Sequence, residues 1–206
     1  MSIKIKISRK PVDYAKAISY LEKKVQSVYC NKSDELLWIL SHPDTFTAGI
    51  SSKNNEILDN KIKIIKTNRG GKITWHGPGQ KIFYFVINLS KRKKDIRKFI
   101  NVIEKIVIDT LKEYKIKSFA DRKNIGIWVK KNGKIEKVAA IGVKIKKWIA
   151  YHGCSININN DLSRYDKIIP CGIKNRGITN LYKIKKQNFK NFEKVLIKNF
   201  LKNLKS

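Results

Sequence analysis

The sequence predicts an α+β domain with a mixed or mostly antiparallel sheet flanked by helices. The two clearest helical patterns, at 95–114 and 189–204, are separated by groups of strand-like segments instead of alternating with them one by one. Such grouping favours an α+β arrangement over a doubly wound parallel sheet. A chain of 206 residues with no internal repeat, low-complexity linker or break in composition is expected to form one domain, 1–206.

The first two elements follow from residue periodicity. Ile3, Ile5 and Ile7 alternate with charged residues, which predicts a strand with one buried face. Pro11 suits a helix start, because a helix leaves its first N–H groups unpaired in any case. Apolar residues then recur at helical spacing, at Ala17, Ile18, Leu21, Val25 and Val28.

The next segments are shorter and more varied. The apolar run 36–40 predicts a buried strand, and the polar, turn-rich segment 41–60 predicts a surface loop. Strands are expected at 61–66 and 81–89, with the glycine-rich segment 69–80 between them.

The second half contains the strongest helix and a hairpin. An apolar stripe through 95–114 predicts an amphipathic helix. Asn132-Gly133 is the favoured pair for a type I′ turn, so a hairpin is expected around it. Its strands, the strand that follows and a closing amphipathic helix are placed at 125–130, 134–149, 151–159 and 189–204.

Charge is the most unusual property of the composition. Lys and Arg number 46 against 16 Asp and Glu, a formal net charge of +30. Nucleic acid, an anionic membrane and an acidic protein are the partners that such a surplus suggests. However, 39 of the cations are Lys spread along the whole chain, whereas nucleic-acid readers favour the planar fork of Arg. The main interpretation is a solvated basic coat, with steering of an acidic partner ahead of nucleic-acid binding.

The cysteines and the N-terminus indicate the compartment. Cys30, Cys154 and Cys171 show no C-x-x-C spacing, which argues against a zinc ribbon or a disulfide framework and for a reducing cytoplasm. The first ten residues lack the apolar stretch of a signal peptide, and no long uncharged apolar window predicts a membrane span. No cluster of His and Cys predicts a metal site.

The segment 69–80 carries two glycine-rich bends, Gly70-Gly71 and Gly77-Pro78-Gly79. Glycine lets a ligand approach the main chain closely. The Walker and Rossmann glycine patterns are both absent. Because costly residues such as Arg69, Trp75 and His76 accompany the glycines, we interpret the segment as a substrate-cradling loop, with a purely structural hairpin as the alternative.

Lys137 is the most distinctive lysine. Parity along the predicted strand places it on one face with Ala139, Ile141, Val143 and Ile145. A lysine on an apolar face is partly desolvated, which lowers its pKa and suits it to proton transfer or to stabilising a thiolate. The alternative is a lysine that snorkels from the strand end.

Cys171 follows an apolar run and lies between Pro170 and Gly172. Such a thiol can act as a nucleophile if a nearby cation lowers its pKa, although most lone cysteines are buried small apolar residues. Cys154 shares parity with Ile156 and Ile158 and is interpreted as a core residue. His76 and His152 each precede a glycine, and each could orient a substrate or be structural.

Together these segments resemble the lipoyl(octanoyl) transferases of lipoate biosynthesis, over roughly 14–181. Residues 41–49 resemble the family's E-H-P-x-x-[YF]-T-x-G, with Ser41 where the family usually has Glu. Residues 69–80 resemble R-G-G-x-[VI]-T-[YW]-H-G-P-G-Q, a long and specific signature. The segments 126–129, 137–142, 152–157 and 170–172 follow in the family's order.

The resemblance implies the fold shared with biotin and lipoate ligases, and roles for individual residues. It implies that Cys171 accepts the octanoyl group as a thioester and that Lys137 is its partner. It implies no metal and no organic cofactor. The substrate-binding residues that it implies are Arg69, Gly70, Gly71, Lys72, Ile73, Thr74, Trp75, His76, Ala140, Ile141, Gly142, Gly153, Cys154 and Ser155.

The resemblance also implies the partners. The octanoyl group would come from octanoyl-acyl carrier protein and go to the ε-amine of a lysine on lipoyl domains of 2-oxoacid dehydrogenase complexes and related proteins, with no nucleic acid or membrane involved. Two alternatives remain: an ATP-dependent lipoate or biotin protein ligase, which needs no nucleophilic cysteine, and a basic nucleic-acid-binding module.

Overall fold

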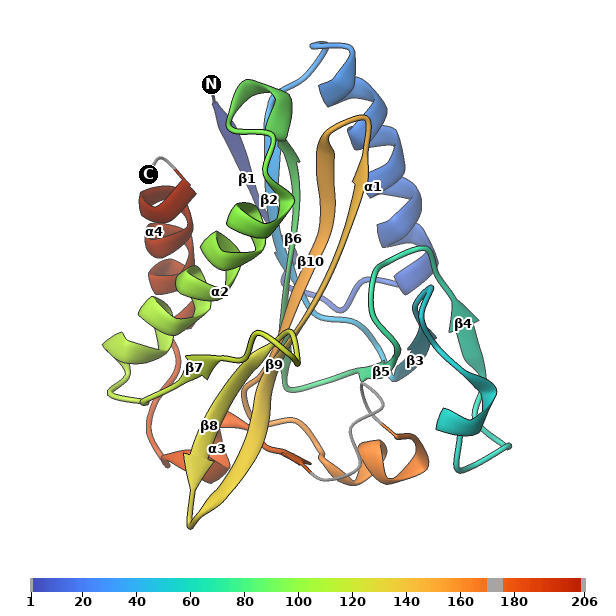
Figure 1. Ribbon diagram of the computed structural model, residues 1–206, viewed down its shortest axis with the longest axis vertical. Coiled ribbons are helices and arrows are strands. Elements are labelled where there is room, and N and C mark those ends of the chain that lie inside the picture. Colours follow the sequence, from blue (N-terminus) through green and yellow to red (C-terminus); the bar gives the residue numbers. More distant parts are fainter. Residues whose placement is uncertain (1, 170–175, 205–206) are drawn as a thin grey trace.

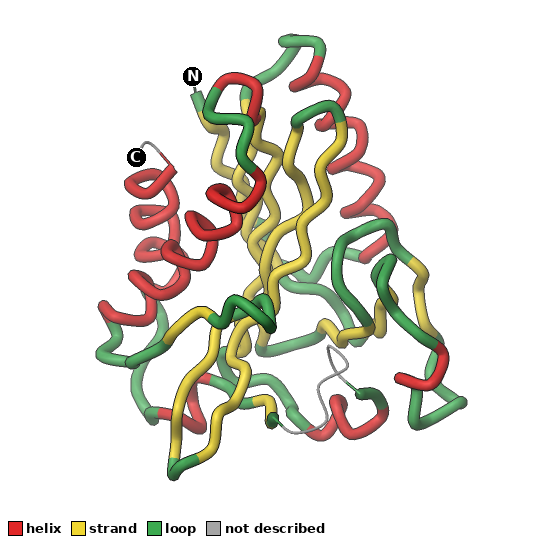
Figure 2. Tube along the Cα trace, viewed as in Figure 1, coloured by secondary structure: helices red, strands yellow, loops and turns green. Residues whose placement is uncertain are grey.

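The computed structural model describes residues 2–169 and 176–204 (Figure 1). Cys171 lies outside the described residues. Within them, a large sheet runs through the molecule, with helices on both of its sides and a small second sheet near one end (Figures 1 and 2).

The large sheet is mixed but mostly antiparallel, as predicted. Only the pairs β1–β2 and β11–β9 are parallel among its described strands. In spatial order the strands are β1 (Ile3–Ile7), β2 (Glu35–Leu40), β6 (Gln80–Asn88), β10 (Ile149–Asn157), β9 (Lys134–Lys146), β8 (Ile127–Lys131) and β7 (Phe119–Ala120), and β11 (Gly177–Ile178) pairs with the start of β9.

Three helices cover the two sides of this sheet. Helix α1 (Tyr14–Tyr29) packs on one side, against Leu36, Trp38 and Leu40 of β2 and the matching positions of β6 and β10. Helices α2 (Ile96–Glu113) and α4 (Phe192–Leu204) pack on the other, over Leu37 and Ile39. Alternate residues of one strand therefore serve two different cores.

The small sheet supplies one wall of the candidate site. Its order is β4 (Ile64–Lys66), β3 (Thr45–Ala48) and β5 (Ile73–His76). Phe46, Ile73 and Trp75 form a separate apolar cluster with Tyr165 and Ile168. The remaining short elements are the 3-10 helices η1 (Asn54–Glu56), η2 (Leu89–Lys91) and η3 (Ser163–Lys167), and the single-turn helix α3 (Leu181–Ile184).

Most predicted elements are confirmed, with three corrections. Helix α1 does not start at Pro11 but after Asp13, whose carboxylate accepts the N–H of Lys16 and caps the first turn. The segment 41–60 is not a plain loop, because it contains β3 and η1. The glycine-rich segment 69–80 likewise contains β5. These strands are short and mixed in polarity, so the sequence showed no strand-like alternation of apolar and polar residues there.

The hairpin between β8 and β9 has the predicted turn. Asn132 and Gly133 both have positive φ, +48° and +77°, as a type I′ turn requires. The turn joins the end of β8 to the start of β9, which carries Lys137.

Candidate active site

A central cavity lies between the small sheet and the middle of strands β6, β9 and β10. All the substrate-binding residues that the sequence analysis named line it, except Gly70 and Trp75. His152, which the sequence analysis named as a residue that could orient a substrate, lines it as well. Ile82 and Tyr84 also line it, and sequence reasoning named neither. The full lining is Arg69, Gly71, Lys72, Ile73, Thr74, His76, Ile82, Tyr84, Ala140, Ile141, Gly142, His152, Gly153, Cys154 and Ser155.

Close backbone approach joins the glycine-rich segment to β9. A Cβ atom on Gly70 would lie 2.7 Å from the carbonyl oxygen of Val143, and one on Gly142 would lie 3.0 Å from the carbonyl oxygen of Gly70. Both contacts involve backbone, which cannot move aside cheaply. Glycine is therefore required at Gly70 for the two backbones to meet at the cavity wall, and a side chain at Gly142 would press on the same backbone.

Arg69 is the buried cation of the cavity. Only 8% of it is exposed, and it holds the small sheet in place. Its Nη2 donates to the carbonyl oxygen of Thr47 at 2.9 Å and to the Thr47 hydroxyl at 2.8 Å, and its Nη1 donates to the carbonyl oxygen of Gly70 at 3.0 Å. A guanidinium keeps its charge at any working pH, so the cavity wall is permanently electropositive.

His42 and Tyr84 form a buried hydrogen-bonded pair beside the cavity. The Nδ1–H of His42 donates to the carbonyl oxygen of Val12 at 2.6 Å, which leaves Nε2 to accept from the Tyr84 hydroxyl at 2.8 Å. Burial lowers the pKa of His42 and raises that of Tyr84 well above its usual value. Both side chains are therefore neutral.

His76 is fixed by Gln80. The Gln80 amide donates from Nε2 to the Asn157 side-chain oxygen at 2.8 Å, so its Oε1 faces Nδ1 of His76 at 3.2 Å and accepts from it. Burial, with His42 and Arg69 nearby, lowers the pKa of His76 well below its usual value. The ring stacks on Tyr14 at a centroid distance of 6.0 Å.

His152 has the most unusual backbone in the site. It lies within β10 yet has φ +68°, a left-handed conformation that costs a residue other than glycine about 1–3 kcal/mol. Its Nε2 lies 2.8 Å from the side-chain oxygen of Asn68. Burial, together with the charges of Arg69 and Lys144, lowers its pKa to about 3.

Lys137 is buried, with 4% exposure, but the parity argument for its face was wrong. The register shift at β8 pairs Ile127 with Ala139 and Trp128 with Lys137, so Val138 is an extra residue that reverses the alternation. Ile127 and Ala139 belong to the core under α2 and α4. Lys137, opposite Trp128, therefore faces away from that core.

The Lys137 ammonium has a defined position. Its Nζ lies 4.7 Å from the centroid of the Trp128 ring and donates to the carbonyl oxygen of Ile125 at 3.2 Å. The Arg176 guanidinium lies on the same ring, 4.9 Å from its centroid. Ile178 of β11 pairs with Lys137, and Thr179 donates its N–H to the carbonyl oxygen of Lys137 at 3.0 Å. The chain just after the segment with Cys171 thus lies beside Lys137.

Neither described cysteine is suited to be the nucleophile. Cys154 lines the cavity but is 2% exposed, and burial raises its thiol pKa far above the usual range despite the nearby Lys137. A thiol of that kind stays protonated and unreactive. Cys30 is exposed at the end of α1, where its sulfur accepts from Gln26.

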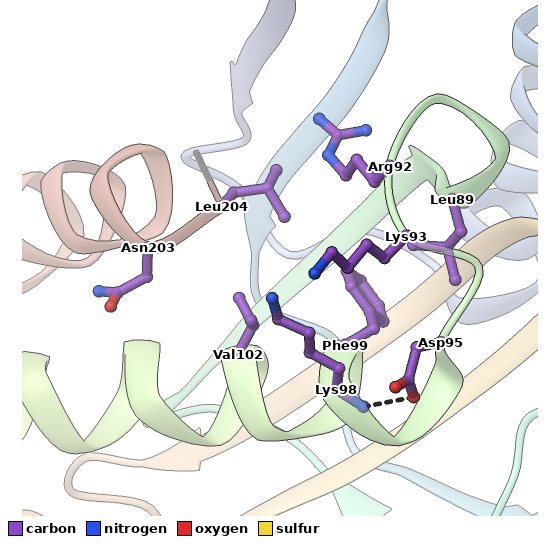
Figure 3. A pocket seen from close by; sticks show the side chains of 9 residues that line it. All are labelled: Leu89, Arg92, Lys93, Asp95, Lys98, Phe99, Val102, Asn203 and Leu204. Carbon is purple, nitrogen blue, oxygen red and sulfur yellow. Dashed lines mark hydrogen bonds between the residues drawn. The ribbon is translucent and has the colours of Figure 1, made fainter. Parts of the chain in front are cut away.

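A second cavity, of about 250 Å³, lies on the other side of the sheet and holds none of the predicted site residues (Figure 3). It opens between the start of α2 and the end of α4. Figure 3 shows Asp95 accepting the backbone N–H of Lys98 at its rim. Arg92, also at the rim, donates from Nη1 and Nη2 to the two carboxylate oxygens of Glu35, at 2.5 and 2.7 Å.

Neither a metal site nor a membrane-spanning helix is found among the described residues. Over 2–169 and 176–204, no group of three or more His, Cys, Asp or Glu side chains is placed to hold a metal ion. None of the helices in that same part of the chain is long and apolar enough to cross a membrane.

The sequence model of the lipoyl protein ligase A/B catalytic domain matches residues 13–201. The chain therefore belongs to this family.

Two relatives of similar sequence are both named octanoyltransferase. The chain is 43% identical over 199 residues to the octanoyltransferase of Wolbachia sp. subsp. Brugia malayi, covering 95% of this chain and 97% of that protein. It is 42% identical over 184 residues to the octanoyltransferase of Ehrlichia chaffeensis, covering 88% and 86%.

Solved structures confirm the predicted fold. A lipoate-protein ligase A bound with ATP has a TM-score of 0.77 at 16% identity, covering all of this chain and 86% of that one. A biotin protein ligase from Aquifex aeolicus, in complex with biotin and ATP, has a TM-score of 0.57 at 20% identity, covering 98% and 70%. At these identities the likeness concerns the fold alone.

Proposed function

We propose that this protein is an octanoyltransferase, an acyltransferase that acts in protein lipoylation. The observation that carries the proposal is the identity of 41–44% with proteins named octanoyltransferase over most of the chain. Its single catalytic domain takes octanoyl from octanoyl-acyl carrier protein and transfers it to a lysine of a lipoyl domain. It works in the cytoplasm, where the thiol of Cys171 stays reduced.

The first half-reaction loads the enzyme. The Cys171 thiolate attacks the octanoyl thioester, a new C–S bond forms, and the C–S bond to the carrier breaks. The carrier sulfur leaves with the electron pair and takes a proton from the Lys137 ammonium. The Lys137 ammonium suits this role, because its charge stabilises a nearby thiolate and its N–H groups can give a proton.

The second half-reaction transfers the acyl group. The neutral ε-amine of the acceptor lysine attacks the thioester carbon, a C–N bond forms, and the bond to Cys171 breaks. The amine gives up one proton, which returns to the Cys171–Lys137 pair. Amide formation from a thioester runs downhill, so no ATP is required. A covalent intermediate of this kind predicts ping-pong kinetics.

The placement of Lys137 supports this assignment. Cys171 lies six residues before β11, and six residues of chain span at most about 21 Å. β11 pairs with Lys137 itself, so the described strand that follows Cys171 in the sequence lies beside the ammonium. The lining of the central cavity by Ile73, Ile82 and Ile141 suits an acyl chain.

The positive charge suits both partners. Carrier and lipoyl domains are acidic as a rule in this family, and a strongly basic enzyme would capture both by electrostatic steering. The net charge of +30 exceeds what such steering needs, so we assign only part of it to docking.

Intact mass spectrometry tests the proposal. After incubation with octanoyl-acyl carrier protein, the wild-type enzyme should gain one octanoyl group on Cys171. Cys171→Ser should gain none and should lose nearly all transfer to a lipoyl domain, while Cys30→Ser, an exposed control, should behave as wild type.

The same experiment distinguishes the transferase from the alternative, an ATP-dependent lipoate ligase. A lipoate ligase forms an acyl-adenylate, so Cys171→Ser would keep its activity and that activity would depend on ATP. Octanoyl transfer that proceeds in Cys171→Ser without a covalent adduct would refute the transferase assignment.

A further inference from the structure

His152 lines the central cavity and has a buried nitrogen without a hydrogen-bond partner among the described residues. It lines the cavity, it is 1% exposed, and its Nδ1 has no partner among the described residues. A buried polar atom without a partner is expensive, and its presence calls for an explanation. The left-handed backbone of His152 is a second departure from the ordinary at the same residue.

A chain of hydrogen bonds fixes the tautomer of this imidazole. The side-chain amide of Asn68 donates from Nδ2 to the Glu22 carboxylate at 2.8 Å, which orients the amide. Its oxygen therefore faces Nε2 of His152, at 2.8 Å, and can only accept. Nε2 thus carries the proton, and Nδ1 is a bare acceptor.

The surroundings keep the ring neutral and in place. Burial disfavours a second proton on the ring, and the charges of Arg69 and Lys144 act in the same direction. The ring stacks on Tyr151 at a centroid distance of 4.6 Å and meets the Tyr84 ring edge-on at 6.4 Å. Nδ1 is consequently an acceptor held in a fixed direction at every physiological pH.

We infer that Nδ1 of His152 accepts a hydrogen bond from the attacking amine in the second half-reaction, and so positions the acceptor lysine. This inference rests on the proposed function. Once the enzyme is loaded, the carrier and the N–H groups of its prosthetic arm have left, and the octanoyl chain and its thioester carry no N–H or O–H. The attacking neutral amine has two N–H groups and needs only its lone pair for attack. The positive field of Arg69 and Lys144 favours a neutral amine over an ammonium. His152 neither gains nor loses a proton in the step.

Two substitutions separate the ring nitrogens. Glutamine reaches the place of Nε2 and can keep the contact with Asn68, but it offers no acceptor at Nδ1. Asparagine reaches the place of Nδ1, restores an acceptor there, and tolerates the left-handed backbone well. The half-reactions are followed one at a time, first as loading of Cys171 from octanoyl-acyl carrier protein, then as single-turnover transfer from the octanoyl-enzyme to an apo lipoyl domain.

His152→Gln should slow the second half-reaction by about tenfold, the worth of one hydrogen bond, and leave loading unchanged. His152→Asn should recover most of the second rate. Equal slowing of both half-reactions in His152→Gln, slowing of loading alone, or a wild-type second rate would overturn the inference. A merely structural role would slow both steps together.

If the variants do not fold, nitrogen NMR of the wild-type enzyme tests the same inference. In wild-type enzyme labelled with ¹⁵N-histidine, Nδ1 of His152 should show the shift of an unprotonated nitrogen and should move when the apo lipoyl domain is added. No movement at saturation, or a protonated Nδ1, would contradict the inference. If the wild type forms no octanoyl-enzyme at all, the proposed function fails instead, and the two failures are thus distinguishable.

Discussion

The two sides of the large sheet are built for different purposes. Beneath α2 and α4 lies a continuous core of apolar side chains, from Leu37 on β2 to Phe200 on α4. On the opposite side, under α1 and the small sheet, polar groups are buried just as deeply: Arg69, His76 and His152 are all less than 9% exposed. The same strands form both surfaces.

The two sides of the sheet contribute to the free energy of folding with opposite signs. Apolar burial on the α2–α4 side is the main favourable contribution to folding. Dehydrating an arginine and neutral histidines works against folding unless each is hydrogen-bonded. In return, the cavity holds fixed donors, acceptors and charge that need no rearrangement during a reaction.

Lys137→Met should give the largest effect on activity without a matching effect on stability. It removes the buried charge but keeps an apolar side chain of similar length, so transfer should fall about 10³-fold, while the free energy of unfolding stays equal or rises. Single-turnover transfer and urea unfolding measure the two effects. Lys146→Met, exposed at the end of the same strand, should change neither. A loss of stability that matches the loss of activity would show that Lys137 is structural.

The fold was largely predictable because its main elements carry clear periods. Residues 36–40 and 81–89 are apolar runs, and α2 has a complete apolar stripe. Strands β3 and β5 of the small sheet were missed because they have four residues each and are joined by polar or glycine-rich chain. Strands of that length are defined by their partners, which no local pattern contains.

The lining of the central cavity could be predicted from the sequence in large part, but its geometry could not. The signature 69–80 and the glycines of β9 and β10 lead to the cavity, and burial of Lys137 was expected. The bulge at Val138 reversed the face of Lys137, and the left-handed His152 could not be read from a strand pattern. Tyr84 could have been found from the sequence. It alternates with Phe83 and Phe85 along the strand, so it faces the opposite side of the sheet, and a buried tyrosine hydroxyl there needs a hydrogen-bond partner.

Neighbouring residues of β6 give the next test, because they point to opposite sides. Phe85 is fully buried against Phe99 and Phe200. Phe85→Ala should lower the free energy of unfolding by about 3–5 kcal/mol, with transfer per folded molecule unchanged. Tyr84→Phe leaves Nε2 of His42 buried without its donor, which should cost about 1–3 kcal/mol and also slow transfer. If Phe85→Ala slowed transfer as much as Tyr84→Phe, the two sides would not be separable.

The smallest expected effect is on the pH dependence of stability, and it should come from the polar side. Because the folded pKa of His152 is about 3 and the unfolded value is near 6.5, the unfolded state binds the extra proton between these limits. Its burial therefore has no pH-dependent penalty above about pH 6.5 and destabilises the fold increasingly as pH falls, by about 1.4 kcal/mol per pH unit, or about 2 kcal/mol at pH 5. His42 and His76 act in the same direction, since their pKa values are also lowered.

His152→Gln tests this contribution, because it removes one of the three histidines. The difference in unfolding free energy between wild type and variant should therefore change by about 2 kcal/mol from pH 7 to pH 5. The titration of the carboxylates is the same in both proteins and drops out of this difference. Parallel pH curves for the two proteins would mean that His152 is not held neutral in the fold.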